Sequence, residues 1–181
     1  MDIKKTYQGI LEGLKIGGRG QVKLSSDESK ELHLALKEAL DNKSSKELEE
    51  ILCILGHDQN YSPEFTPDLI KILEQDFSKE IMVYTLSALV RHDIQANQRQ
   101  GQRVKEETLK VLQKLLDHTE PEVVEWVLRT IDEMGSQGIF YWQKLKEIKP
   151  HRLSGLINKH KRNVVEIIEM LERKWETYGK K

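Results

Sequence analysis

The sequence predicts an all-α fold, in the form of a right-handed α-solenoid of three to four stacked antiparallel helix pairs. Three observations favour this fold. The chain is rich in Leu, Glu and Lys and has only four prolines among 181 residues. Its apolar residues recur at helical rather than alternating spacing, and this apolar pattern repeats along the chain. With 38% hydrophobic residues, a chain of this length can bury a core.

The N-terminal segment predicts a short helix followed by a hinge. Residues 2–16 have a helical pattern, and the sequence IGGRGQ then ends it, because clustered glycines cost backbone entropy inside a helix. We therefore expect two parts: an N-terminal helix with a Gly-rich hinge over residues 1–26, and a helical-repeat domain over residues 27–181.

The first helix pair of the repeat domain is expected between residues 26 and 57. Ser26 or Asp27 is suited to the N-cap of its first helix, with leucines at fourfold spacing behind it. Asn42 and Ser44 then form a tight turn before the second helix, 45–57.

The remaining helices follow from similar start signals. Thr66 with Pro67, Ser78, and Thr119 with Pro121 are typical residues at helix N-termini. The expected elements are helices at 67–76, 79–92, 104–118, 120–134, 139–148 and 162–179, with a polar connection at 93–103.

The apolar pattern repeats in register. A shift of 42 residues places Ile81 on Val123, Leu86 on Leu128 and Leu89 on Ile131. A shift of 76 residues places Leu48, Leu52 and Leu55 on Val124, Leu128 and Ile131. Because a single short helix pair cannot bury its apolar face alone, such pairs are expected to stack on their neighbours.

The segment LLDHTEPEVVEWVLRTI resembles the HEAT-repeat family of armadillo/HEAT-like α-solenoids. It has a leucine pair, a turn aspartate, and a proline and valine at the start of the second helix, here Leu115–Leu116, Asp117, Pro121 and Val123. The segment with Asp76 and Ile81 is a weaker second copy. The resemblance covers residues 27–135 well, and it implies a fold, not an activity.

Trp126 is the residue that this repeat pattern singles out. Glu125, Arg129, Asp132 and Glu133 lie on the polar arc of its helix, so these side chains are expected to face solvent, with Trp126 at the edge of that arc. The 42-residue shift places Trp126 on Tyr84, so the two aromatics either form an exposed anchor or pack between repeats. The expected partner-binding residues are Tyr84, Arg91, Trp126, Arg129 and Glu133.

No pattern in the chain indicates catalysis, a metal site or a cofactor. Cys53 is the only cysteine, and Cys53 and His57 lack a second pair of ligands. His33 and His160 show no partner spacing, and His92 is expected at a helix end, where its charge suits the helix dipole.

The predicted function is therefore non-catalytic binding of a protein partner by a cytoplasmic adaptor, regulator or inhibitor. The net charge of −1 indicates no overall field for nucleic acid or membrane, and no membrane role is expected. An alternative is nucleic-acid binding through the basic segment 144–162, with Phe140 to Trp142 stacking on bases. Its basic residues are Lys144, Lys146, Lys149, Arg152, Lys159, Lys161 and Arg162. A lesser alternative is a HEAT-like DNA glycosylase using Trp126, Arg129 and Asp132.

Overall fold

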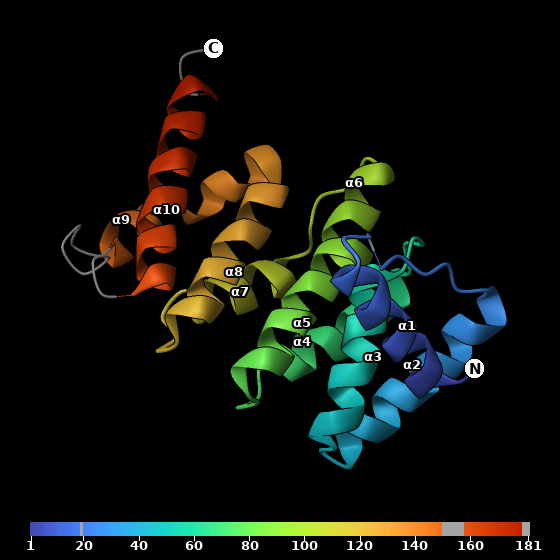
Figure 1. Ribbon diagram of the computed structural model, residues 1–181. Coiled ribbons are helices and arrows are strands. Elements are labelled where there is room, and N and C mark those ends of the chain that lie inside the picture. The colour runs from blue at the N-terminus through green and yellow to red at the C-terminus, as the bar shows by residue number, and fades with distance from the viewer. Residues whose placement is uncertain (19, 150–157, 179–181) are drawn as a thin grey trace. The chain divides into compact units, whose positions relative to one another are not determined.

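The computed structural model describes residues 1–18, 20–149 and 158–178 (Figure 1). Within these residues the chain is helical, and the one β-bridge joins Val22 to Asp58. The all-α prediction is confirmed. No helix of the described residues has the length and apolar character needed to cross a membrane.

The chain divides into two compact units, residues 1–100 and residues 101–181. The elements of the first unit are α1 (Ile3–Lys15), α2 (Ser26–Asp41), α3 (Ser45–His57), η1 (Pro63–Phe65), α4 (Thr66–Leu73), α5 (Lys79–Leu89), the π-helical turn η2 (Val90–Gln95) and α6 (Ala96–Arg99). The boundary expected at residue 26 lies inside this unit, where α1 packs against α3.

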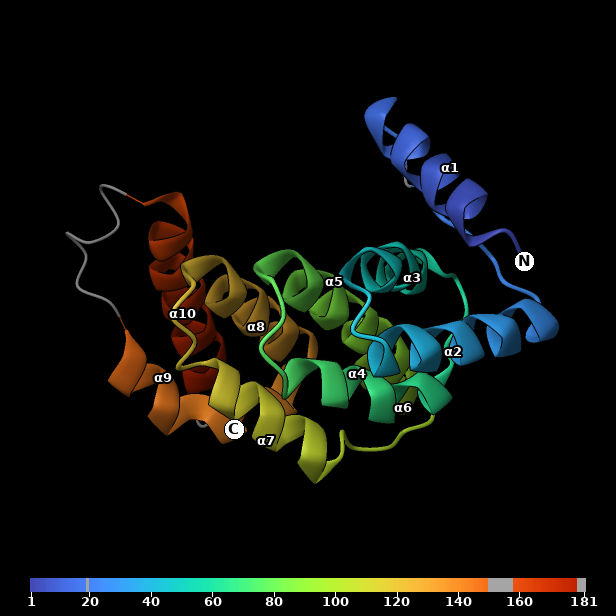
Figure 2. The ribbon, with the colours of Figure 1, turned by 90° about the horizontal axis from the view of Figure 1, so that it is seen from below.

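Helix α3 is the centre of the first unit. It packs against α1, α2 and α5 (Figures 1 and 2). Its residues 50–55 are all buried. The antiparallel pairs α2–α3 and α4–α5 both form, and α2 also contacts α4. The expected hairpins of this unit are therefore present, because each buries its apolar face against the next.

The helix caps of this unit follow the sequence signals only in part, and the N-cap of α4 is Phe65 rather than the expected Thr66. Ser78 accepts a hydrogen bond from the backbone N–H of Ile81, as expected for an N-cap. The cap of α2 is Ser25 rather than Ser26 or Asp27. Ser25 is selected because Glu28, three residues later, bonds back to its backbone N–H and completes a capping box.

The prediction of a polar connection at residues 93–103 is wrong for residues 93–99. Helix α5 continues through η2 into α6, so the helical path runs to Arg99. The side chains of His92, Asp93 and Ile94 are buried there, and Asn97 donates to the carboxylate of Asp93. Polar residues that bond one another inside the fold thus give a pattern that resembles a loop in the sequence.

The second unit contains α7 (Glu106–Leu115), α8 (Pro121–Glu133), the 3₁₀ helix η3 (Gly135–Tyr141), α9 (Trp142–Ile148) and α10 (Lys159–Tyr178). Helix α8 packs against both α7 and α10. Helix α10 begins three residues earlier than expected. The reason is Asn158, whose side-chain oxygen accepts from the backbone N–H groups of His160 and Lys161.

The aromatic segment that joins α8 to α9 divides between core and surface. Tyr141 is fully buried and its hydroxyl donates to the carbonyl of Leu109. Trp142 lies 5.7 Å from Trp175 between ring centroids, whereas Phe140 is 54% exposed. Tyr141 and Trp142 therefore anchor the segment, and Phe140 is left at the surface.

Gly138 provides a direct test of this packing. A Cβ atom there would lie 2.9 Å from the carbonyl oxygen of Ile131 and 3.0 Å from Cζ2 of Trp175. We expect Gly138→Ala to lower the free energy of unfolding by about 1–3 kcal/mol in chemical denaturation. The matched control is Gly9→Ala on α1, where nothing lies within 4 Å, so that this change should be neutral or stabilise by up to about 1 kcal/mol. Equal effects of the two changes would contradict the packing of α10 over η3.

Candidate partner-binding surfaces

The five residues expected to bind a partner lie in both units. Tyr84 and Arg91 belong to the first unit, and Trp126, Arg129 and Glu133 belong to the second.

Tyr84 lies on α5 and is partly buried. Burial, followed by the neighbouring Cys53 and Glu49 of α3, raises the pKa of its hydroxyl above the ordinary value. Tyr7 of α1 behaves similarly: burial and the nearby Glu49 raise its pKa to about 12. Tyr84 therefore rests beside α3 and presents only part of its ring to solvent.

Arg91 belongs to a cluster that the sequence analysis did not identify. Its Nη1 donates to the hydroxyl of Tyr61 at 3.2 Å, and its Cζ lies 5.3 Å from the centroid of the Tyr61 ring. Cζ of Arg99 lies 3.9 Å from the same centroid. The ring thus holds two guanidinium groups through cation–π contacts, and we call these three residues the Arg91–Tyr61–Arg99 cluster.

Neither arginine of this cluster forms an ion pair with an acid among the described residues. Arg99 is exposed, while Tyr61 and Arg91 are partly exposed. The π-helical turn η2 carries Arg91, and α6 carries Arg99 eight residues later. That spacing is close to two helical turns. In the sequence, it is the one signal that could have placed the two arginines on the same side of a continuous helix.

Trp126 lies on α8 and is partly exposed. Its neighbours along the helix towards the core, Val123 and Val127, are fully buried. Trp126 therefore lies at the edge of the buried face and offers part of a large aromatic surface to solvent.

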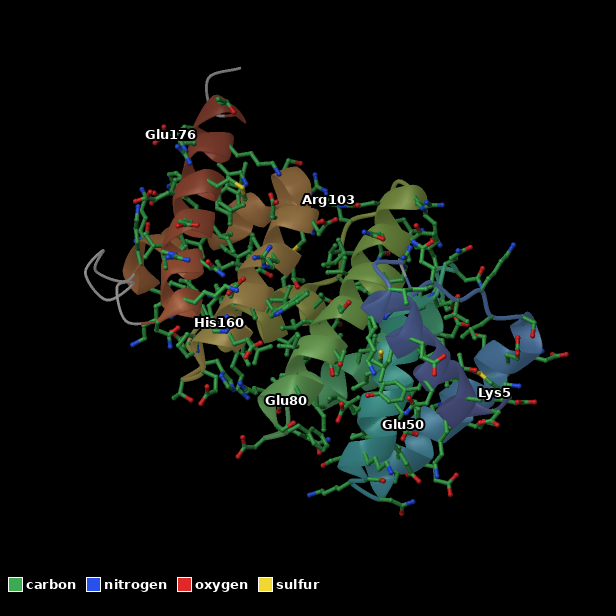
Figure 3. All side chains as sticks on the ribbon, in the orientation of Figure 1. Lys5, Glu50, Glu80, Arg103, His160 and Glu176 are labelled. Carbon is green, nitrogen blue, oxygen red and sulfur yellow. The ribbon has the colours of Figure 1, made fainter. Side chains whose placement is uncertain are left out.

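Glu125 corrects the prediction that the acids of this helix face solvent. Its side chain is only 5% exposed. It accepts hydrogen bonds from Arg129 at 2.7 Å, His160 at 2.8 Å and Asn163 at 3.0 Å (Figure 3 labels His160). Although burial opposes ionisation, the bonds from Arg129, His160 and Asn163 hold the pKa of Glu125 below its usual value.

The partners of Glu125 could not be recognised from the sequence, because they lie far from it along the chain. His160 and Asn163 lie on α10, 35 and 38 residues from Glu125, and they meet it because α10 packs on α8. His33 similarly bonds Asp68, at 3.0 Å across 35 residues. Arg129 forms an ion pair with Glu125. Glu133 is exposed at the end of α8.

The basic segment 144–162 is largely engaged within the second unit. Lys144 bonds Asp117 at 2.7 Å, Lys149 bonds Glu172 at 2.7 Å, and Arg162 lies 3.8 Å from Glu166. Lys146 lies over the Trp142 ring, 4.6 Å from its centroid. Lys159 and Lys161 are exposed, and Arg152 lies outside the described residues.

His92 is a buried structural residue, which corrects its expected place at a charged helix end. Its Nδ1 accepts from the backbone N–H of Ser62 at 3.1 Å, so its Nε2 carries the proton and donates to the carbonyl of Leu55 at 2.9 Å. The side chain is fully buried, and burial is the main cause that lowers its pKa. His92 thus joins the loop before α4 to the end of α3 as a neutral group.

Cys53 does not have the surroundings of a reactive thiol. The thiol is buried on α3, and burial raises its pKa to about 11, which disfavours a reactive thiolate. His57 bonds the carbonyl of Cys53. In the described part of the chain, no three His, Cys, Asp or Glu side chains are grouped to hold a metal ion.

Comparison with family models, with curated proteins and with solved structures finds no match for this chain. Function therefore has to be inferred from the side chains themselves.

The buried His92 predicts a pH dependence of stability. Its pKa is lowered in the folded state, so the unfolded chain binds more protons as the pH falls through about 6.5. The contribution of His92 to the free energy of unfolding is therefore fully present above this pH and declines below it. Between pH 7.5 and pH 5.5 we expect His92 to contribute a loss of up to about 1.4 kcal/mol in the free energy of unfolding.

Chemical denaturation at several pH values measures this loss. In His92→Gln the decline over the same interval should become shallower, whatever the absolute stability of the variant. An unchanged slope would show that His92 is not neutral in the folded protein.

Proposed function

We propose that the protein is a non-catalytic, HEAT-like helical-repeat protein that binds a protein partner as an adaptor, regulator or inhibitor. The helix pairs support this proposal. In the first unit the second helices α3 and α5 pack on each other, and in the second unit α8 packs on α10. Stacking through second helices is the arrangement that the repeat pattern predicts. Because α1 also covers α3, the faces proposed for binding are those of α5 in the first unit and of α8 in the second.

The observation that carries the binding proposal is the Arg91–Tyr61–Arg99 cluster. Arginine and tyrosine are among the residues that dominate binding energy in protein interfaces. Here Tyr61 restrains two arginines that have no acidic partner in the described chain, so less side-chain freedom is lost when they bind. A partner with carboxylate groups would form charge-assisted hydrogen bonds with both guanidinium groups.

Trp126 and Glu133 provide the corresponding surface of the second unit. Trp126 offers a partly exposed aromatic ring, and Glu133 lies two helical turns further along α8 on its exposed side. Nucleic-acid binding is less favoured, because Lys144, Lys149 and Arg162 already face acids of their own unit.

The first test of this function is the double change Arg91→Ala with Arg99→Ala. We expect it to weaken binding of the captured partner by about tenfold or more, because both charge-assisted contacts are lost. The partner is first identified by affinity capture from cells that express the protein, and its affinity is then measured by titration. The control is Arg173→Ala, which removes an exposed arginine of the second unit.

Two results would contradict this proposal. One is equal affinity of the double variant and the wild type. The other is capture of nucleic acid alone, with retention on DNA that falls steeply with salt.

The second test is Trp126→Ala. Because Trp126 is only partly buried, we expect the free energy of unfolding to fall by less than about 2 kcal/mol, whereas partner affinity should fall by about tenfold or more. Denaturation and titration of the same sample measure both quantities. A stability loss of about 3–5 kcal/mol with unchanged affinity would place Trp126 in the core instead.

A further inference from the structure

A pocket of about 560 Å³ opens in the first unit among α1, α2 and α3. The start of α1 forms one wall, the end of α2 a second, and the start of α3 the third. The lining residues are Met1, Asp2, Ile3, Lys4, Ala35, Glu38, Asn42, Glu47, Glu50 and Ile51. Four of them are carboxylates, which makes this an acidic pocket.

Glu50 distinguishes this pocket from an ordinary acidic surface. Its side chain is only 7% exposed, yet it has no hydrogen bond or ion pair with any described residue (Figure 3 labels it on α3). Other buried acids have donors within the chain: Asp68 bonds His33 and Lys71, and Glu125 has three donors. One carboxylate oxygen of Asp58 accepts from two backbone N–H groups, and its other oxygen is enclosed without a partner. The carboxylate oxygens of Glu50 are not among the fully enclosed polar atoms that lack a partner, so they reach the open space of the pocket. A carboxylate with a covered stem and no partner in the chain is placed to receive a cation from this pocket.

The other charges around the pocket do not neutralise it. Asp2, Glu38 and Glu47 are exposed at its rim, and Asp2 also caps α1 by accepting from the backbone N–H of Lys5. The cations in the lining are Lys4 and the terminal amino group, and the amino group already bonds Glu31, outside the pocket. The carboxylates of the pocket thus outnumber the cations that face it.

The chemistry of a suitable cation follows from the lining. No three acids here are grouped closely enough for a metal ion, as is true throughout the described residues. The walls also include the apolar side chains of Ile3, Ala35 and Ile51, which suit an alkyl chain. Separated carboxylates on partly apolar walls match a cation whose charges are spaced along methylene groups.

We propose that this pocket binds aliphatic ammonium groups, with Glu50 as the deep carboxylate that receives one of them and Glu38 and Glu47 facing the others. Two sources share this chemistry: a free oligoamine, or lysine side chains of a bound peptide. The site is separate from the Arg91–Tyr61–Arg99 cluster, so it does not depend on the function proposed above.

Isothermal titration of the full chain at low ionic strength tests the site. The probes are spermidine and an end-blocked trilysine peptide. We expect at least one of them to bind, with an affinity that falls as salt is added, because the contacts are ionic. Tighter binding of spermidine assigns the pocket to oligoamines, and tighter binding of the peptide assigns it to lysine side chains.

The decisive variant is Glu50→Gln. It should weaken binding of the preferred probe by about tenfold or more, because a charge-assisted hydrogen bond in a buried position is lost. The matched control is Glu74→Gln, which removes one exposed carboxylate of the same unit outside the pocket and should leave the affinity unchanged.

Thermal denaturation keeps the test independent of folding. Without a probe, Glu50→Gln should melt at the same temperature as the wild type or higher, because Glu50 forms no hydrogen bond or ion pair with a described residue that the change could remove. With the probe, only the wild type and Glu74→Gln should gain melting temperature. The proposal is overturned if neither probe binds, if Glu50→Gln binds as well as the wild type, or if that variant melts well below the wild type, since Glu50 would then have a structural partner.

Discussion

The burial of α3 is the constraint on which the first unit depends. A helix with one apolar face needs only one neighbour, but α3 contacts α1, α2 and α5, so its residues 50–55 are buried in succession. The carbonyl of Leu55 at its C-terminal end is also the acceptor for His92. Packing from several sides brings Glu50 and Cys53 inside together with the leucines and isoleucines, and this is how a carboxylate comes to line a pocket wall.

Buried polar groups then fix how distant segments meet. His92 joins η2 to the end of α3 and to Ser62, and Glu125 joins α8 to α10 through His160 and Asn163. Each of these groups would be costly to bury alone, so its partners are required wherever the packing places it. Glu50 differs from both, because its carboxylate has no partner in the described chain and faces a pocket instead.

The candidate surfaces differ in the sign of their charge. The Arg91–Tyr61–Arg99 cluster presents two restrained guanidinium groups, whereas the pocket of Glu50 presents carboxylates. With a net charge of −1 for the whole chain, neither property follows from composition. Both result from local separation of charge on one unit, which suits a protein that recognises partners through specific groups rather than through its overall field.

The sequence by itself determined the helices of this protein. Helical spacing of leucines and residues such as Ser78 and Pro121 act over one or two turns, so they are legible without knowing what lies nearby. The same local logic failed at residues 93–99, where polar side chains bond each other inside the fold and resemble a loop. It also placed Glu125 in solvent and left His160 without a partner. Only the tertiary structure decided these points, together with the pairing of Arg91 and Arg99 on Tyr61 and the burial of Glu50. The physical reason is that each depends on groups brought together from separate segments, and the sequence pattern of one helix contains no information about its neighbour.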